Sequence, residues 1–208
     1  MIINLEAFLI AITILTITPG LDTALVIRNA SRGGAKDGIA TSFGICVGLF
    51  VHATLSAVGI SAILAQSAQW FGIVKMIGAV YLIWLGFCTL KDIYKGKSNS
   101  TDWATNQTHY SGMRSIREGF LSNILNPKTA VFYLAFLPQF IDPQTSAFAQ
   151  TLLMASIHFV IAMIWQSGLA LSLISAKSLL GSNAFLRRME ATTGAVLVGL
   201  GIKLMIEA

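Results

Sequence analysis

The sequence predicts an all-α integral membrane protein in which six transmembrane helices form two inverted three-helix repeats. Hydrophobic residues make up 55% of the chain and charged residues only 11%, and the mean hydropathy is +0.73, which excludes a water-soluble globule. Six apolar stretches reach the ~20 residues that a spanning helix needs. Pro19 and Pro127 interrupt two of these stretches at corresponding places, which predicts that helices 1 and 4 are broken there.

The expected spans account for nearly the whole chain. They cover residues 5–27, 38–64, 70–90, 119–141, 147–175 and 187–206. A single membrane transport domain over residues 1–208 leaves no room for a soluble nucleotide-binding or catalytic domain. No Lys or Arg precedes Arg28, so we expect a retained first helix rather than a cleaved signal peptide. The sequence has no Gly-rich phosphate loop, nucleophile elbow or HExxH motif, so we expect neither an enzyme nor a bound cofactor or metal.

The basic residues alternate between the two ends of the spans. Eleven of the 14 Lys and Arg fall in the connections after the first, third and fifth spans, whereas the alternate connections, 65–69 and 142–146, have none. The positive-inside rule makes the basic connections cytoplasmic and places both termini outside. The net charge of +5 is therefore a sign of topology in a lipid bilayer, and we expect no nucleic-acid partner.

One long connection divides the chain into two halves. Residues 92–117 are polar, and we expect a largely disordered cytoplasmic linker. Repeat one then covers about residues 1–91 and repeat two about residues 118–208. Because each half has three spans, the second half enters the membrane in the opposite orientation, which predicts an inverted repeat.

Each broken span has a helix-capping residue before its proline. Thr18 and Asn126 precede Pro19-Gly20 and Pro127 as an N-cap precedes a proline at the first helical position. A half-helix beginning there would direct free N–H groups and the positive end of its dipole into the membrane. Transporters hold anionic substrate groups at such ends. The alternative is a kink without function, since neighbouring helices can satisfy the freed backbone groups.

Asp22 and Lys128 are the only charged residues in the two interrupted apolar runs, 7–27 and 119–141. A carboxylate costs ~2.5–3.5 kcal/mol at the centre of a membrane helix by insertion scales, so Asp22 is a candidate counter-ion for an ammonium group, a candidate proton carrier, or both. Lys128 can meet a substrate carboxylate. The alternatives without function are an ion pair between the two residues and snorkelling of Lys128 to the surface.

The other polar residues inside the spans each have two interpretations. The amides of Asn123, Asn126 and Gln139 either contact substrate or make only interhelical hydrogen bonds. His52 and His158 either relay protons, which would couple transport to a proton gradient, or bond neighbouring helices.

Gly44 and Gly48 form a GxxxG motif on the second span. This motif lets helices approach closely, either within the subunit or in a homodimer. Trp165 and Gln166 lie in the middle of the fifth span, as lining residues of a site or as packing residues. The two cysteines stand alone without metal-ligand spacing, and we expect them in the core.

At these motifs the chain resembles the lysine exporter superfamily, and within it the homoserine/threonine efflux branch. The resemblance is carried by Thr18-Pro19-Gly20-Leu21-Asp22, by Gly34, Gly38, Gly44 and Gly48, and by Asn123-x-x-Asn126-Pro127-Lys128. The family pattern usually reads TPGPD, and here Leu21 replaces the second proline. The resemblance implies export of amino acids across the bacterial cytoplasmic (inner) membrane, driven by the proton motive force. It leaves the amino acid open, and the apolar and aromatic residues near the breaks favour a small neutral one such as homoserine, threonine or leucine.

These observations combine into one expected mechanism. A zwitterion would place its carboxylate on a half-helix N-terminus or on Lys128 and its ammonium on Asp22. Rocking of one half against the other would expose the site alternately, and protonation of Asp22 from outside would drive release, which is proton antiport. A passive channel and a non-transporting membrane assembly subunit remain alternatives. A thiol–disulfide carrier would need cysteines beside both prolines, and the chain has none there.

Overall fold

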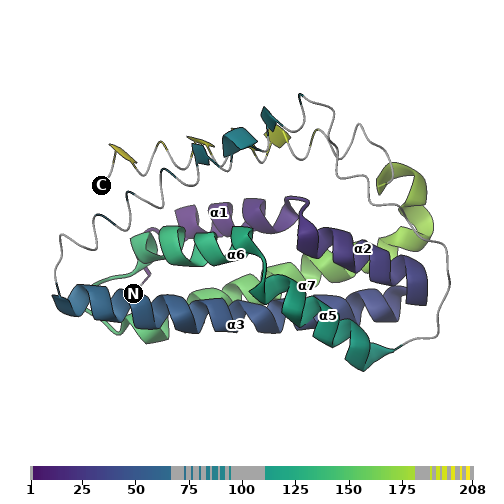
Figure 1. The fold of residues 1–208 in the computed structure, drawn as a ribbon, viewed down its shortest axis with the longest axis horizontal. Helices are drawn as coiled ribbons and strands as arrows, with labels where there is room; N and C mark the ends of the chain where they lie inside the picture. The colour runs from purple at the N-terminus through teal and green to yellow at the C-terminus, as the bar shows by residue number, and fades with distance from the viewer. Residues whose placement is uncertain are drawn as a thin grey trace.

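The computed structural model describes residues 2–66 and 111–180 continuously, together with single positions within 73–94 and 188–206. The predicted spans at 70–90 and 187–206, and residues 95–110 of the predicted linker, therefore lie wholly or mostly outside the described residues. Every regular element within the described part of the chain is helical. In Figure 1 these helices lie side by side along one long axis.

The first predicted span forms two helices, α1 (Leu5–Ile17) and α2 (Leu21–Gly33), whose axes differ by 48°. Pro19 disfavours helical geometry at the residue before it, and Thr18 is extended, with ψ 121°. The expectation that Thr18 is the N-cap of the second half is wrong. Thr18 ends α1, its hydroxyl donating to the Ile14 carbonyl at 2.6 Å, and Gly20 precedes α2 instead.

A single glycine reverses the chain between α2 and the long helix α3 (Ala35–Gln66). Gly34 has φ +81°, a conformation that glycine adopts without steric cost and that side chains with a Cβ avoid. The reversal brings α3 back antiparallel to α1 and α2, so polar residues at the end of α2 face those at the start of α3.

The second broken span consists of α5 (Gly112–Ile124), α6 (Pro127–Val131), the π-helix η1 (Phe132–Phe136) and the 3₁₀-helix η2 (Leu137–Phe140). Asn126 is the N-cap of α6, as expected, and its Oδ1 accepts from the backbone N–H of Lys128 at 3.0 Å. Irregular helical turns of this kind, π-turns above all, are frequent at functional sites.

The start of α5 corrects the predicted linker, because the helix begins at Gly112 and residues 112–117 are not disordered. Ser115, Gly119 and Asn123 are buried at a spacing of four, so one small and polar face of α5 packs inside the protein. Mean hydropathy does not detect such a face, which is why the span was predicted to begin only at 119.

Small residues bring α3 and α5 into close contact. A Cβ at Gly44 would collide with the Ile116 carbonyl, and a Cβ at Gly119 would collide with the Thr41 carbonyl. A Cβ at Gly48 would lie 2.7 Å from Asn123 Oδ1. Gly44 and Gly48 therefore face α5 of the same chain, and the intrasubunit contact accounts for the motif.

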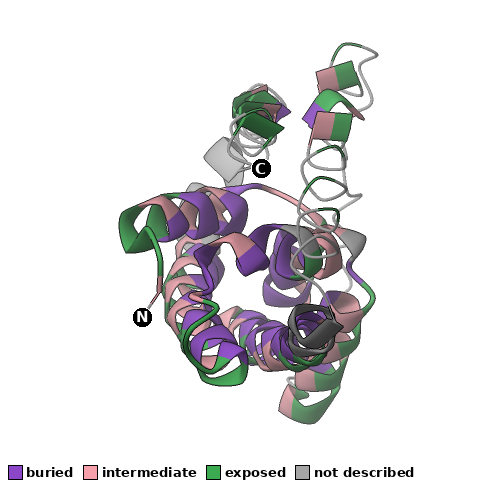
Figure 2. Ribbon diagram, turned by 90° about the vertical axis from the view of Figure 1, so that its left-hand side faces the viewer, coloured by how far each residue is buried: buried purple, intermediate pink, exposed green. Residues whose placement is uncertain are grey.

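The remaining long helix is α7 (Ala147–Leu180). Among the described residues, α3 over Ala35–Ile60 and α7 over Ala147–Ser172 are long and apolar enough to cross a membrane, and α1 with α2 makes a third span if the bent pair is counted as one. Figure 2 shows the buried positions of the helices turned toward the middle of the bundle. The loop between η2 and α7 contains no Lys or Arg.

Candidate functional site

The breaks in the two interrupted spans meet at an internal cavity of about 40 Å³. It is walled by the α1–α2 break, by α3, by the α5–α6 break and by α7. Its polar lining residues are Thr16, Thr18, Asp22, Thr23, Asn123, Asn126, Lys128, Thr129, His158 and Gln166. The volume admits water but lies far below the roughly 300 Å³ of ordinary ligand pockets. A larger ligand therefore enters only if the surrounding helices move apart.

The Asp22 carboxylate lies in the first turn of α2 and is held by side chains of the other broken span. Its Oδ1 accepts from Ser122 Oγ at 2.9 Å. Its Oδ2 accepts from the side-chain amides of Asn123 at 2.9 Å and Asn126 at 3.0 Å. A carboxylate offers about four acceptor positions, so the three neutral donors that the described residues supply leave one open. The charge also lies at the positive end of the α2 dipole, which favours it.

The Lys128 ammonium lies at the end of α1. Its Nζ donates to the carbonyls of Leu15 at 3.3 Å and Thr18 at 3.4 Å, where the break leaves carbonyls without intrahelical partners. A cation at this position also suits the negative end of the helix dipole. No ion pair within 4 Å joins Lys128 to Asp22, although both line the cavity. The simple ion pair that the sequence left open is therefore not formed.

Two buried histidines flank one buried tyrosine beside the cavity. The ring of Tyr133 lies 5.9 Å from that of His52 and 5.9 Å from that of His158, centroid to centroid. The Tyr133 hydroxyl and His158 Nδ1 form a hydrogen bond of 3.1 Å. His52 Nε2 donates to the backbone carbonyl of Asn123 at 2.9 Å, and His158 itself lines the cavity. Both histidines thus make interhelical hydrogen bonds; His52 is linked to Asp22 through Asn123, and His158 lines the same cavity as Asp22.

Two buried carbonyl oxygens on the cavity wall have no hydrogen-bond partner among the described residues, Asn123 Oδ1 and Gln166 Oε1. The indole N–H of Trp165 is also unpartnered, but Trp165 is not one of the lining residues. Gln139 lies on η2 and does not line the cavity either. The structure thus brings together Asp22, Asn123, Asn126, Lys128, His158 and Gln166 from four separate segments.

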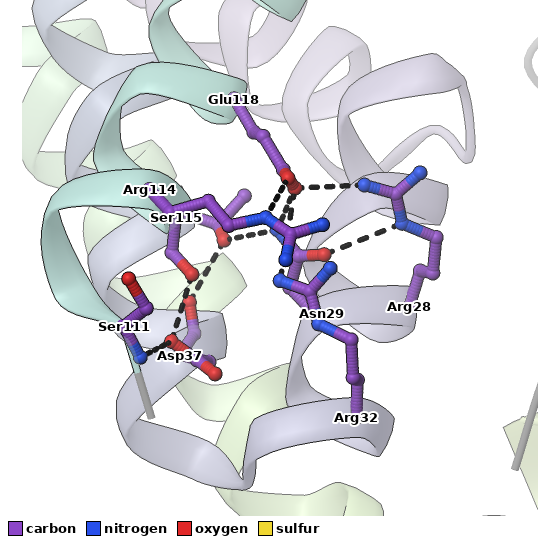
Figure 3. A network of polar contacts seen from close by, with 9 residues as sticks. Arg28, Asn29, Arg32, Asp37, Ser111, Arg114, Ser115 and Glu118 are labelled. Atoms are coloured by element: carbon purple, nitrogen blue, oxygen red, sulfur yellow. Dashed lines mark hydrogen bonds and ion pairs between the residues drawn. The ribbon is translucent and has the colours of Figure 1, made fainter. Parts of the chain in front are cut away.

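A charged network joins α2 to α5 on the side of the cavity that faces the basic connections of the chain, called the basic side below (Figure 3). Glu118 accepts from Arg28 at 2.8 Å, from Arg114 at 2.8 Å and from the Asn29 amide at 3.0 Å. Arg32 lies 3.9 Å from the same carboxylate. From the sequence, the arginines served only as signs of topology, and Asn29, Glu118 and Ser122 were not singled out. Their only signal is spacing, since Ser122 lies one helical turn beyond Glu118 on α5.

The environment of Glu118 keeps it ionised. Burial alone would raise the pKa of this carboxyl, because a charged group is disfavoured away from water. Hydrogen bonds from Arg114 and Asn29 and the charges of Arg28 and Arg32 together outweigh that effect. The pKa of Glu118 therefore lies below its ordinary value of 4.5.

A second carboxylate extends the network toward α3. Asp37 is buried, and its Oδ1 accepts from Ser115 Oγ at 2.7 Å and from the backbone N–H of Ser111 at 3.3 Å. Thr41, one turn along α3, accepts from the Asn29 amide at 2.9 Å. The α2–α3 hairpin is thus fastened to α5 by polar contacts on the basic side.

Aromatic side chains pack together on the other side of the cavity, at the start of α1 and along η1 and η2. Phe132, Phe136 and Phe140 follow one another along η1 and η2 with ring centroids 4.8 and 4.9 Å apart. Phe8 of α1 meets Phe140 edge to face at 5.5 Å. The cavity therefore lies between a charged layer and an aromatic layer, each contributed by both halves of the chain.

Comparison with known proteins agrees with this arrangement. The family model for the LysE type translocator matches residues 13–208. The chain is 33% identical to the uncharacterized membrane protein YrhP of Bacillus subtilis (strain 168), covering 96% of this chain and 97% of that protein. It is 31% identical to the homoserine/homoserine lactone efflux protein of Salmonella typhimurium over 79% of this chain and 77% of that protein. No solved structure matches the chain.

The family resemblance predicted from the sequence motifs is confirmed by these matches. Members of the family are translocators, so the expectation of a transporter rather than an enzyme is confirmed as well. The apolar helices and the relatives named as membrane proteins agree with a membrane setting. The chain belongs to the LysE type translocator family.

Proposed function

We propose that this protein is a secondary transporter that exports small neutral amino acids from the cytoplasm by proton antiport. One observation carries the proposal: a carboxylate and an ammonium group, Asp22 and Lys128, line one cavity without pairing with each other. A zwitterionic amino acid has the two complementary charges. The name of the Salmonella relative, a homoserine/homoserine lactone efflux protein, supports a substrate of this size and polarity.

In the proposed complex the substrate carboxylate binds Lys128 and the substrate ammonium binds Asp22. Among the described residues, Lys128 Nζ makes two long hydrogen bonds, to the Leu15 and Thr18 carbonyls, so a substrate carboxylate gives it a stronger partner. The ammonium takes the fourth acceptor position of Asp22, beside Ser122 and the two asparagines. Pro19-Gly20 and Asn126-Pro127 keep both helices open at this point, where regular helix would fill the space.

Proton coupling follows from competition at Asp22. A proton that reaches Asp22 from outside removes the charge that holds the substrate ammonium, which favours release. The substrate ammonium then leaves and the proton moves inward when the site next opens to the cytoplasm. His158, on the cavity wall, and His52, bonded to Asn123, are the groups best placed to pass that proton.

Alternating access requires the two layers around the cavity to open in turn. We propose that the Glu118 network opens toward the cytoplasm and that the aromatic layer of Phe8 and Phe140 opens outward. The two halves are proposed to be inverted three-helix repeats of a six-span protein in the bacterial inner membrane, with both termini outside. The two broken spans support this, because each half contributes one break to the same cavity.

The test is amino-acid release from cells that overexpress the protein. Cells loaded with mixed dipeptides accumulate amino acids, and the medium is profiled against cells with an empty vector. Selective release of a few small neutral amino acids is expected. Equal profiles for every amino acid would contradict the proposal.

Counterflow in proteoliposomes separates a carrier from a passive channel. A carrier loaded with unlabelled substrate takes up labelled substrate against its gradient and saturates. A channel only equilibrates the label, so the absence of a transient overshoot would favour the channel. Abolition of export by a proton uncoupler is expected for antiport, provided that counterflow persists without a gradient.

A further inference from the structure

Gln166 lines the cavity, and the buried carbonyl oxygen of its side chain has no hydrogen-bond partner among the described residues. The side chain is 5% exposed, and its Oε1 accepts no hydrogen bond from any described residue. His158, Ala162 and Gln166 form the stripe of α7 that lines the cavity, at a spacing of four residues. Val160 and Ile164 of the same helix are 55% and 71% exposed. The amide is therefore turned inward, although buried polar atoms are rarely left unpaired.

A second glutamine on α7 shows that the fold can satisfy such a group. Gln150 is 7% exposed, and its Oε1 accepts from the Asp142 N–H at 2.9 Å. Its Nε2 donates to the Asp142 carbonyl at 3.0 Å and to Thr145 Oγ1 at 2.8 Å. Gln150 thus holds the loop before α7 in place. The structure gives Gln166 Oε1 no such role.

The positions of the charges decide which part of a substrate Gln166 can meet. Asn123 Oδ1, the other unpartnered acceptor, lies against Gly48 of α3, where a Cβ at that glycine would come within 2.7 Å of it, while the Nδ2 of the same amide donates to Asp22. Lys128 takes the substrate carboxylate. Gln166 comes from α7, a helix that contributes neither charge to the cavity. Of the two buried unpartnered acceptors that belong to described lining residues, Gln166 Oε1 is therefore the one left for the substrate side chain.

We propose that Gln166 is a specificity-determining residue whose Oε1 accepts a hydrogen bond from a donor on the substrate side chain. The inference rests on the proposed function. A hydroxyl-bearing amino acid satisfies the buried carbonyl, whereas an aliphatic one of the same size leaves it unpaired, and such sites discriminate strongly against a substrate that lacks the donor.

The test compares substrates that differ by one hydroxyl. Purified parent and Gln166→Met proteins are reconstituted, and initial counterflow rates are measured for threonine against valine and for homoserine against 2-aminobutyrate. The parent is expected to prefer the hydroxyl member of each pair. In Gln166→Met the preference falls roughly two- to tenfold, the value of one net neutral hydrogen bond, while the rate for the aliphatic member does not fall.

Gln150→Met is the matched control. It removes a buried glutamine from the same helix but breaks hydrogen bonds at the outer loop. We expect a lower melting temperature with an unchanged preference. Because a variant can fail to fold, a second measurement uses the unaltered protein, in which threonine should raise the melting temperature more than valine at equal concentration.

Each outcome decides between the two proposals. If Gln166→Met lowers both rates in proportion, or if the parent does not distinguish the members of either pair, the role of Gln166 is wrong and the transport function stands. If the parent moves no amino acid at all, the proposed function fails and the inference falls with it.

Discussion

Replacing Asp22 with asparagine separates the charge of the site from its shape. The three contacts at 2.9–3.0 Å can all persist in Asp22→Asn. The new carbonyl accepts from Asn123 and Asn126, and the new amide donates to Ser122, whose hydroxyl both donates and accepts. Hydrogen bonds to a charged group contribute about 1.5–3 kcal/mol and neutral ones about 0.5–1.5 kcal/mol. That loss is offset in part because the variant no longer buries a charge. We therefore expect a folded protein with a small change in melting temperature.

The effect on transport should be larger than the effect on stability. The substrate ammonium loses one charge-assisted hydrogen bond of about 1.5–3 kcal/mol, which corresponds to roughly a 10- to 150-fold rise in KM. Coupling should be lost as well, because the asparagine side chain does not take up a proton in place of the ammonium. The assay is counterflow of labelled threonine in proteoliposomes at several external pH values.

Ser122→Ala is the control for the hydrogen-bond network. It removes one donor to Asp22 and keeps the carboxylate, so KM should change less than in Asp22→Asn and the pH dependence should remain. If Asp22→Asn had the KM and the pH profile of the parent at equal reconstitution, Asp22 would bind neither the ammonium nor the coupling proton. The mechanism would then be refuted.

Three further predictions follow from the contacts. Lys128→Met should abolish export and lower the melting temperature of the purified protein, because the carbonyls of Leu15 and Thr18 lose their donor. Each buried group left unpaired costs about 1–3 kcal/mol. An unchanged melting temperature would argue against these contacts. Gly44→Ala should destabilise the protein and weaken transport, because the new Cβ would collide with the Ile116 carbonyl. Gly59→Ala on the same helix is the control, since its Cβ would meet nothing within 4 Å and the change should be neutral or slightly stabilising. Equal melting temperatures for the two variants would contradict the close crossing of α3 and α5. Because the pKa of Glu118 is lowered in the folded protein, its stabilising contribution is present above pH 4.5 and is lost as the pH falls through the folded-state pKa. Glu118→Gln should therefore lower the melting temperature at neutral pH and flatten its decline in acid; parallel acid curves for parent and variant would exclude Glu118 as the titrating group.

Much of the site could be predicted from the sequence because it contains residues whose burial in a membrane costs free energy. A charged residue or a proline within an apolar run is expensive in a membrane, so Asp22, Lys128, Pro19 and Pro127 stand out without any structure. The capping role of Asn126 was predicted for the same local reason. Thr18 was wrongly predicted to be the N-cap of the second half-helix. Its hydroxyl can bond either the helix that follows or the helix that precedes it, and in the structure it donates to the Ile14 carbonyl of the preceding helix.

Polar residues that look ordinary in sequence could not be assigned in this way. Nothing in the run around Ser122 or Glu118 distinguishes them from surface residues of a soluble helix. Their long-range partners, Asp22 for Ser122 and Asn29 for Glu118, lie on α2 about 90 to 100 residues earlier in the chain, and only the packing of α5 against α2 brings them together.

The sequence by itself determined that this chain is an apolar helical protein with two interrupted spans and a charge in each, because hydropathy and proline act locally. The tertiary structure decided which groups meet. It joined Asp22 to the amides of the second broken span rather than to Lys128, and it gave Lys128 the carbonyls of α1. It also left Gln166 unpaired while Gln150 was satisfied. The contacts of Asp22 and Lys128 depend on distances between segments about 100 residues apart in the chain, and no local pattern contains them.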